Sequence, residues 1–149
     1  MKKSALLVFF IASSCMVSAS GKRPGQLTDA DWHSAAKAAL TLSSRNDAVT
    51  VVVDDGLPPE ARSALESVRK VVPLADMPDA NVASGRGDYL RVFQFQAQGD
   101  RIEFLEGSVY PKEYQAGDCR VTTHLFLVRT ADGDWKQDGP TQVQVCSRH

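Results

Sequence analysis

The chain has 149 residues and a formal net charge of -1; 43% of its residues are hydrophobic and 23% are charged. At this length, these proportions indicate a single globular domain. The nearly balanced charge argues against a nucleic-acid binder, which needs a basic surface to neutralise phosphates. The composition also excludes a collagen-like or wholly disordered chain.

The first segment has the pattern of an export signal. Lys2 and Lys3 precede an apolar run over residues 5–12. This run is far shorter than the roughly 20 residues needed to span a bilayer. We therefore expect export through the Sec pathway of a bacterium, with the mature protein in the periplasm or anchored at the outer membrane.

Two cleavage sites compete in this segment. In the first, residues 1–19 form a signal peptide, because small residues occupy the two positions that signal peptidase reads. In the second, the signal ends at residue 14, because Cys15 follows a short apolar run and two small residues, as in a bacterial lipobox. Cys15 would then be lipidated, and we expect membrane contact only through this anchor.

The chain beyond the signal divides into a tether and one domain. Residues 20–26 are small, polar or basic and include Pro24 and Gly25, which suits a flexible tether. The domain then covers residues 27–149. At about 130 residues it can bury enough surface for a single hydrophobic core without a structural metal.

Helical and strand patterns alternate at the start of the domain. Thr28 and Asp31 resemble a capping box, and the apolar spacing that follows predicts a helix over residues 29–42 with Trp32 in the core. A β-branched run over 48–53 predicts a strand, and Pro58 and Pro59 open a second helix to about residue 70.

A short strand over residues 71–75 is expected to complete a parallel strand–helix–strand crossover. Pro73 places it at an edge of the sheet, because proline cannot donate a ladder hydrogen bond.

The last 60 residues have the alternation of antiparallel strands. The first pair covers residues 89–97 and 101–110, and we expect Tyr89, Phe93 and Phe95 on one face. The second hairpin turns at residues 132–133, an Asp-Gly pair that favours a two-residue type I′ turn.

The predicted fold class is α+β. Two N-terminal helices pack on a mainly antiparallel twisted sheet of about five or six strands. The order of elements resembles the cone-shaped nuclear-transport-factor-2-like folds and the cystatin-like folds. The resemblance implies an outline only and carries no catalytic residue to this chain.

Cys119 and Cys146 remain after processing, and in an oxidising compartment we expect them to form a disulfide. A two-residue turn at residues 132–133 pairs residues whose numbers sum to 265. The numbers of the two cysteines also sum to 265, so this register places them opposite each other. That register leaves Gln142 and Gln144 on the apolar face, so we expect a one-residue bulge near residues 139–140, with the register relaxed again near Cys119.

No catalytic or metal-binding motif is present, and we expect no catalytic residue, metal or cofactor. His124 alternates with Phe126 and is expected on an exposed or partly covered sheet face. Asp54 and Asp55 precede Gly56 at a strand end, where turn and capping roles are the simplest interpretation.

The sequence instead indicates a protein-contact surface. Tyr110, Lys112 and Tyr114 lie in the connection over residues 110–118, and tyrosines give a large contact area at low entropy cost. A second surface is a polar sheet face, which carries four glutamines: Gln94, Gln96, Gln142 and Gln144.

We therefore expect an exported envelope protein without catalytic activity that binds another protein, as inhibitors and immunity proteins do. The alternative is a small-molecule-binding protein or enzyme with a pocket between the helix over 29–42 and the sheet.

Overall fold

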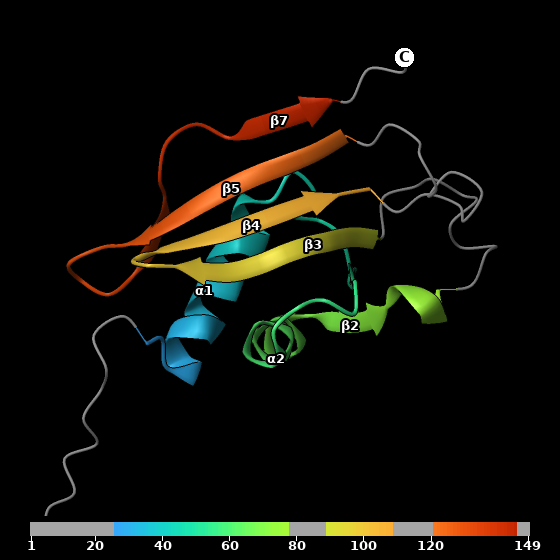
Figure 1. Ribbon diagram of the computed structural model, residues 1–149, viewed down its shortest axis with the longest axis horizontal. Coiled ribbons are helices and arrows are strands. Elements are labelled where there is room, and N and C mark those ends of the chain that lie inside the picture. Colours follow the sequence, from blue (N-terminus) through green and yellow to red (C-terminus); the bar gives the residue numbers. More distant parts are fainter. Residues whose placement is uncertain (1–25, 78–88, 109–120, 146–149) are drawn as a thin grey trace, which may run out of the picture.

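The computed structural model describes residues 26–77, 89–108 and 121–145 (Figure 1). It confirms the α+β class: two N-terminal helices pack on a mostly antiparallel, open sheet of seven strands. The helices are α1 (Asp29–Leu42) and α2 (Pro59–Val68), with a short 3₁₀ helix, η1 (Leu74–Asp76). The strands are β1 (Thr50–Val53), β2 (Lys70–Pro73), β3 (Tyr89–Gln98), β4 (Arg101–Gly107), β5 (Val121–Arg129), β6 (Trp135–Gln137) and β7 (Gln142–Val145).

The strand order is β2-β1-β3-β4-β5, and both β6 and β7 pair with the far side of β5. β1, α2 and β2 form the predicted parallel crossover, and β2 lies at the sheet edge where Pro73 placed it. β1 also runs parallel to β3. All four residues of β1 are buried, which explains its β-branched composition.

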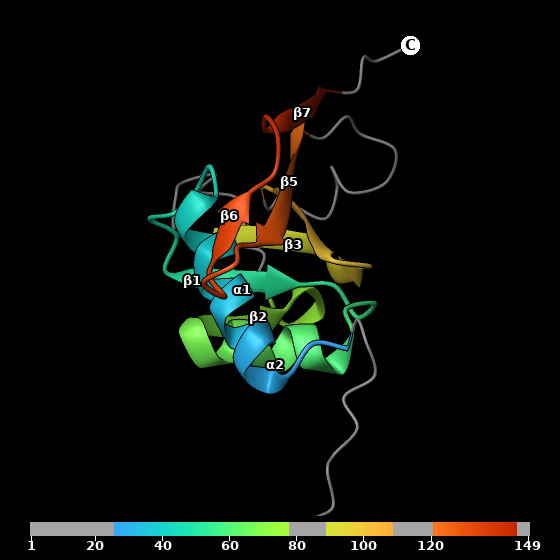
Figure 2. The same cartoon turned by 90° about the vertical axis from the view of Figure 1, so that its left-hand side faces the viewer.

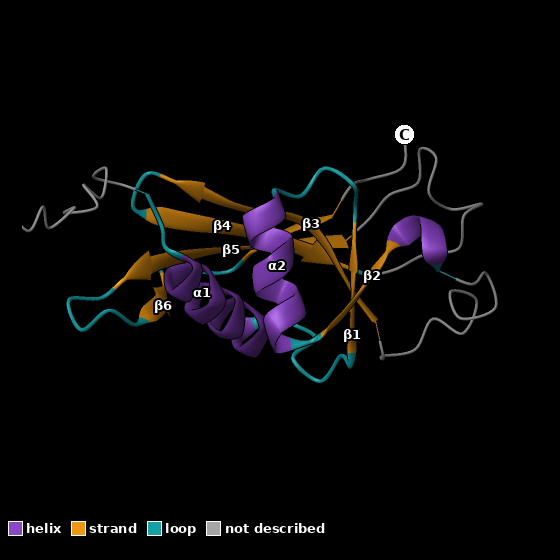
Figure 3. Cartoon of the chain, turned by 90° about the horizontal axis from the view of Figure 1, so that it is seen from below, coloured by secondary structure: helices purple, strands orange, loops and turns teal. Residues whose placement is uncertain are grey.

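The core lies between the helices and the sheet. α1 and α2 lie next to each other across one face of the sheet (Figure 3). Trp32 packs edge-on against Phe95, with ring centroids 5.3 Å apart, and Phe95 packs in the same way against Phe104. Ala35, Ala36 and Ala39 are fully buried and let α1 lie close to the strands.

α1 has the predicted bounds and the predicted capping box. Thr28 Oγ1 accepts a hydrogen bond from the Asp31 backbone N–H at 3.2 Å, and Asp31 Oδ2 accepts one from the Thr28 N–H at 2.8 Å. The same carboxylate also pairs with Arg129 on β5, with 2.7 Å between Asp31 Oδ1 and Arg129 Nη2. The cap therefore also fixes α1 to the sheet.

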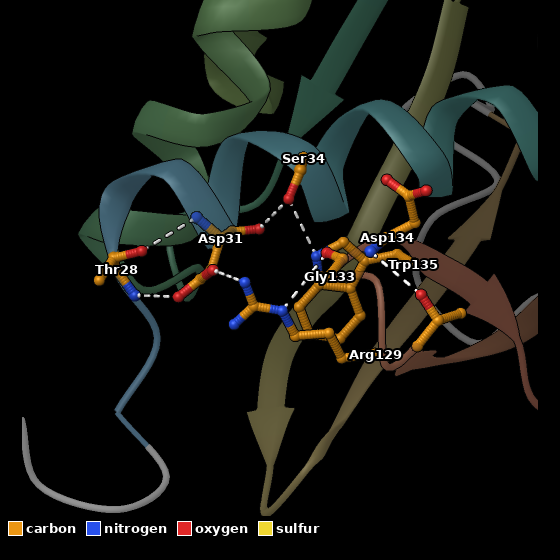
Figure 4. Close-up of polar contacts among 8 residues, drawn as sticks. Thr28, Asp31, Ser34, Arg129, Gly133, Asp134 and Trp135 are labelled. Atoms are coloured by element: carbon orange, nitrogen blue, oxygen red, sulfur yellow. Dashed lines mark hydrogen bonds and ion pairs between the residues drawn. The ribbon is translucent and has the colours of Figure 1, made fainter.

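A second contact ties α1 to the hairpin formed by β5 and β6 (Figure 4). Trp135 Nε1 donates to Ser34 Oγ at 3.0 Å, and the Ser34 hydroxyl donates to the Asp31 carbonyl. Arg129 Nε donates to the Gly133 carbonyl in the turn of the same hairpin at 3.3 Å.

The predicted faces of β3 are wrong for Tyr89 and Phe93. Leu90 and Val92 face the helices, and a register shift between Val92 and Gln94 then moves Phe95 to that side. Phe93 follows Val92 and lies on the opposite face, where a Cβ on Gly107 would lie only 2.9 Å from Phe93 Cε2. The missing side chain at Gly107 therefore makes room for the ring.

The predicted two-residue turn between β5 and β6 is also wrong. The Gly133 N–H donates to the Thr130 carbonyl, and Gly133 has a φ of +90°, whereas no described non-glycine residue has a positive φ. This is a three-residue loop with a type I turn, because a type I′ turn would also need a positive φ at Asp132.

The return strand is interrupted near residues 139–140, as expected, but the sum of the paired residue numbers changes by two instead of the one that the predicted bulge requires. The numbers of paired residues in β5 and β6 sum to 264. In β5 and β7 they sum to 266, for example for Val121 and Val145. The later register places Gln142 and Gln144 opposite His124 and Thr122, away from the apolar face. Cys119 and Cys146 lie outside the described residues, and their disulfide stays a prediction.

Candidate functional site

The face of β3, β4 and β5 that points away from α1 is called the open face here. In Figure 1 these strands lie in front of α1, and no described helix covers them on the near side. Each strand contributes alternate residues to this face. Six of these residues form connected contacts and are called the open-face cluster: Gln96, Gln98, Arg101, Glu103, His124 and Phe126.

Glu103 lies at the centre of the cluster. Its Oε2 accepts hydrogen bonds from Gln96 Nε2 at 2.8 Å and from Gln98 Nε2 at 2.6 Å. His124 Nδ1 lies 3.7 Å from the other carboxylate oxygen. The carboxylate is thus largely buried among side chains that hold it in one orientation.

Arg101 occupies the neighbouring position on β4. Its guanidinium carbon lies 4.8 Å from the centroid of the Phe126 ring, and its Nη2 lies 2.6 Å from Asp138 Oδ2. The His124 ring meets the Phe126 ring edge-on at a centroid distance of 6.1 Å. A cation, an aromatic ring and a carboxylate are therefore ordered side by side on one surface.

His124 is half-buried on the open face, as the alternation predicted. Gln94 and Gln96 share this face, since they pair with Leu105 and Glu103 of β4. Gln142 and Gln144 extend the same polar surface onto β7. The structure thus brings together the four glutamines of the predicted polar face.

A partly buried ion pair lies at the end of β3 that pairs with β1. Arg91 Nε and Nη2 donate to the two carboxylate oxygens of Asp54, both at 2.9 Å, and the guanidinium stacks over the Phe93 ring. Arg91 Nη1 is buried without a hydrogen-bond partner. Asp54 therefore positions Arg91, a role beyond the turn residue that its sequence context indicated.

Glu106 is a fully buried carboxylate on the helix side of β4. It accepts hydrogen bonds from the Ser43 hydroxyl and, at 2.8 Å each, from the Ser44 backbone N–H and hydroxyl. These donors follow the last residue of α1, so Glu106 holds the end of that helix to the sheet. Glu106 was not among the predicted site residues; its local signal is an acidic residue at an inward position, two residues after Phe104.

A hollow of about 220 Å³ lies between α1 and α2. Trp32 and Ala64 form part of its wall, and His33 Nδ1 lies 2.6 Å from Ser67 Oγ at its rim. The alternative interpretation placed a pocket between α1 and the sheet instead. That interface is filled by buried side chains, including Trp32 and Phe95.

Several predicted site residues cannot be placed. Tyr110, Lys112, Tyr114 and the cysteines at 15, 119 and 146 lie outside the described residues. Among the described residues, no group of three or more histidine, cysteine or acidic side chains could hold a metal ion. No helix in this part of the chain is long and apolar enough to cross a membrane.

Comparisons of the chain with protein-family models, with curated proteins and with solved structures found no match.

Proposed function

We propose that this protein is an exported, non-enzymatic envelope protein that binds a protein partner through the open face of its sheet. An inhibitor or immunity-like role fits such a module. The connection over residues 110–118, with Tyr110, Lys112 and Tyr114, is proposed to contribute to the same contact.

The observation that carries the proposal is the pre-ordered open-face cluster. Arginine and aromatic side chains are enriched at protein interfaces, and Arg101 is stacked on Phe126 before any partner binds. The amides of Gln96 and Gln98 hold Glu103 in place. Because these side chains are already ordered, binding would cost little additional conformational entropy.

The test is affinity capture from the envelope fraction of the source bacterium with two arginine variants. Arg101→Glu reverses a charge at the open face, and Arg62→Glu makes the same change on α2. The two arginine side chains are similarly exposed, at 44% and 40%, and each forms one surface ion pair. We expect Arg101→Glu to weaken capture of the partner at least about tenfold, as for an arginine at an interface hot spot.

Arg62→Glu should capture the partner as the wild type does. Equal capture by both variants, or equal loss in both, would contradict a partner site on the open face. Failure of the wild-type protein to enrich any envelope protein would contradict the proposed function as a whole.

Small-molecule binding is the second candidate function, and the hollow between α1 and α2 favours it. Trp32 offers an aromatic wall there, and the His33–Ser67 pair offers polar groups at the rim. The hollow lies on the helix side, so a ligand bound in it would be unaffected by Arg101→Glu.

A further inference from the structure

β7 forms an unprotected edge of the sheet. In the described chain it pairs only with β5, so the backbone groups on its other side have no strand partner. Gln142, Val143 and Gln144 are all exposed, and Val143 is 61% exposed. β7 lies at the end of the molecule farthest from α2 (Figures 1 and 2), so α2 does not obstruct a strand that approaches it.

The other edges of this sheet carry protection against strand pairing. β2 has an exposed lysine, Lys70, and ends in Pro73. β6 has an exposed Lys136, and its Trp135 is hydrogen-bonded to α1. Charged residues and proline are the usual means of blocking edge-to-edge association, and β7 contains neither.

The sequence of β7 is complementary to itself. Its four residues alternate Gln-Val-Gln-Val. In a two-fold antiparallel pair centred on Val143, Val143 opposes its own copy and Gln142 opposes Gln144, and directly opposite residues share a face. Val121 of β5 is exposed and lies on the same face as Val143, so the pairing would bring two apolar patches together.

We propose that the protein forms a symmetric dimer in which β7 of one copy pairs antiparallel with β7 of a second copy. A second copy is the occupant because the uncharged, alternating edge matches itself without charge repulsion. The paired edge is short, since the chain bends at Gly139, which has a φ of +80°, and at Pro140. The dimer is therefore concentration-dependent and joins two seven-stranded sheets into one.

The test uses the purified exported protein at low and high concentration. Sedimentation velocity measures the fraction of dimer, and hydrogen exchange measures protection of the amides of residues 142–145. We expect the dimer fraction and the protection of β7 to rise together with concentration. The exchange measurement needs no variant, so it does not depend on how well a mutant folds.

Two valine variants provide the matched comparison. Val143→Lys places charges near the two-fold axis, whereas Val49→Lys makes the same change just before β1, at a valine that is similarly exposed, at 67%. We expect Val143→Lys to weaken the dimer at least about tenfold, because like charges face each other across paired strands. Val49→Lys should leave it unchanged.

Three results would overturn this proposal. The first is a wild-type protein that stays monomeric across the concentration range. The second is a dimer that resists Val143→Lys or responds equally to Val49→Lys. The third is exchange at residues 142–145 that slows only when an envelope protein is added, which would assign the edge to a different partner. None of these results bears on the Arg101→Glu capture experiment, so the two proposals can fail separately.

Discussion

Glu106 is an acidic residue in a position where packing alone would favour an apolar one. Its carboxylate is fully buried, and the donors that compensate for its lost hydration come from Ser43 and Ser44. A buried carboxylate is tolerated when such hydrogen bonds replace its water. The consequence is a fixed end for α1, because the two serines follow its last residue.

Glu106→Gln should therefore destabilise the domain although it preserves the size of the side chain. The new amide NH₂ would face a donor group, and a charge-assisted hydrogen bond would be lost. We expect the free energy of unfolding to fall by about 1–3 kcal/mol, measured by urea denaturation.

Glu66→Gln is the matched control for this change. Glu66 is half-exposed on α2 and pairs with Arg62 one helical turn away. Glu66→Gln should change the free energy of unfolding by no more than about 0.5 kcal/mol. Equal losses in the two variants would show that burial of the Glu106 carboxylate has no special role.

These residue-level interactions could not be predicted from the sequence. Glu106 and Ser44 are 62 positions apart, and Arg91 and Asp54 are 37 apart. Hydrophobic periodicity indicates which face a residue occupies but not which distant side chain it meets. His124 was predictable because its placement needed only the alternation along one strand.

Among the elements, α1 makes contacts at its N-terminus that reach well beyond the helix itself. Asp31 closes the capping box and also pairs with Arg129 beside the β5–β6 turn. One side chain thus couples the start of the helix to the hairpin that covers it.

A comparison of Asp31→Ala with Asp29→Ala separates the capping and ion-pair roles of Asp31 from the general effect of a negative charge near a helix N-terminus. Both residues lie in the first turn of α1, so both interact with the helix dipole. Only Asp31 makes the cap and the ion pair. We expect Asp31→Ala to cost about 1–2 kcal/mol more than Asp29→Ala in thermal or urea unfolding; equal costs would contradict the coupling.

The sequence predicted the existence of most elements well, because their patterns are local. The capping box and the alanine stripe correctly predicted both ends of α1, and Pro73 correctly predicted the edge position of β2. Two details failed for a common reason. Phe93 occupies space left by Gly107 on another strand, and the strand that follows Gly133 is hydrogen-bonded to α1 through Trp135 and Ser34, so both details involve residues distant in the sequence.

At the scale of the whole molecule, the predicted localisation of the protein can be tested directly. We expect a lipid on Cys15, which metabolic labelling with palmitate would detect in the wild-type protein. Cys15→Ala should abolish the label and release the protein into the soluble periplasmic fraction. Labelling that survives in Cys15→Ala would contradict lipidation at Cys15. A wild-type protein that takes up no label would leave residues 1–19 as an ordinary signal peptide.

The position of β1 between two parallel neighbours has a consequence for how the chain assembles. Within the described residues, the strand ladders of the β1–α2–β2 unit and of the β3–β7 meander meet only where β1 pairs with β3. Thr50 and its partner Tyr89 are about 40 residues apart, so this ladder closes a longer loop than any hairpin in the sheet. The β1–α2–β2 unit and the β3–β7 strands can each form their own hydrogen bonds early in folding. The continuous sheet forms only when β1 pairs with β3, which is a long-range contact.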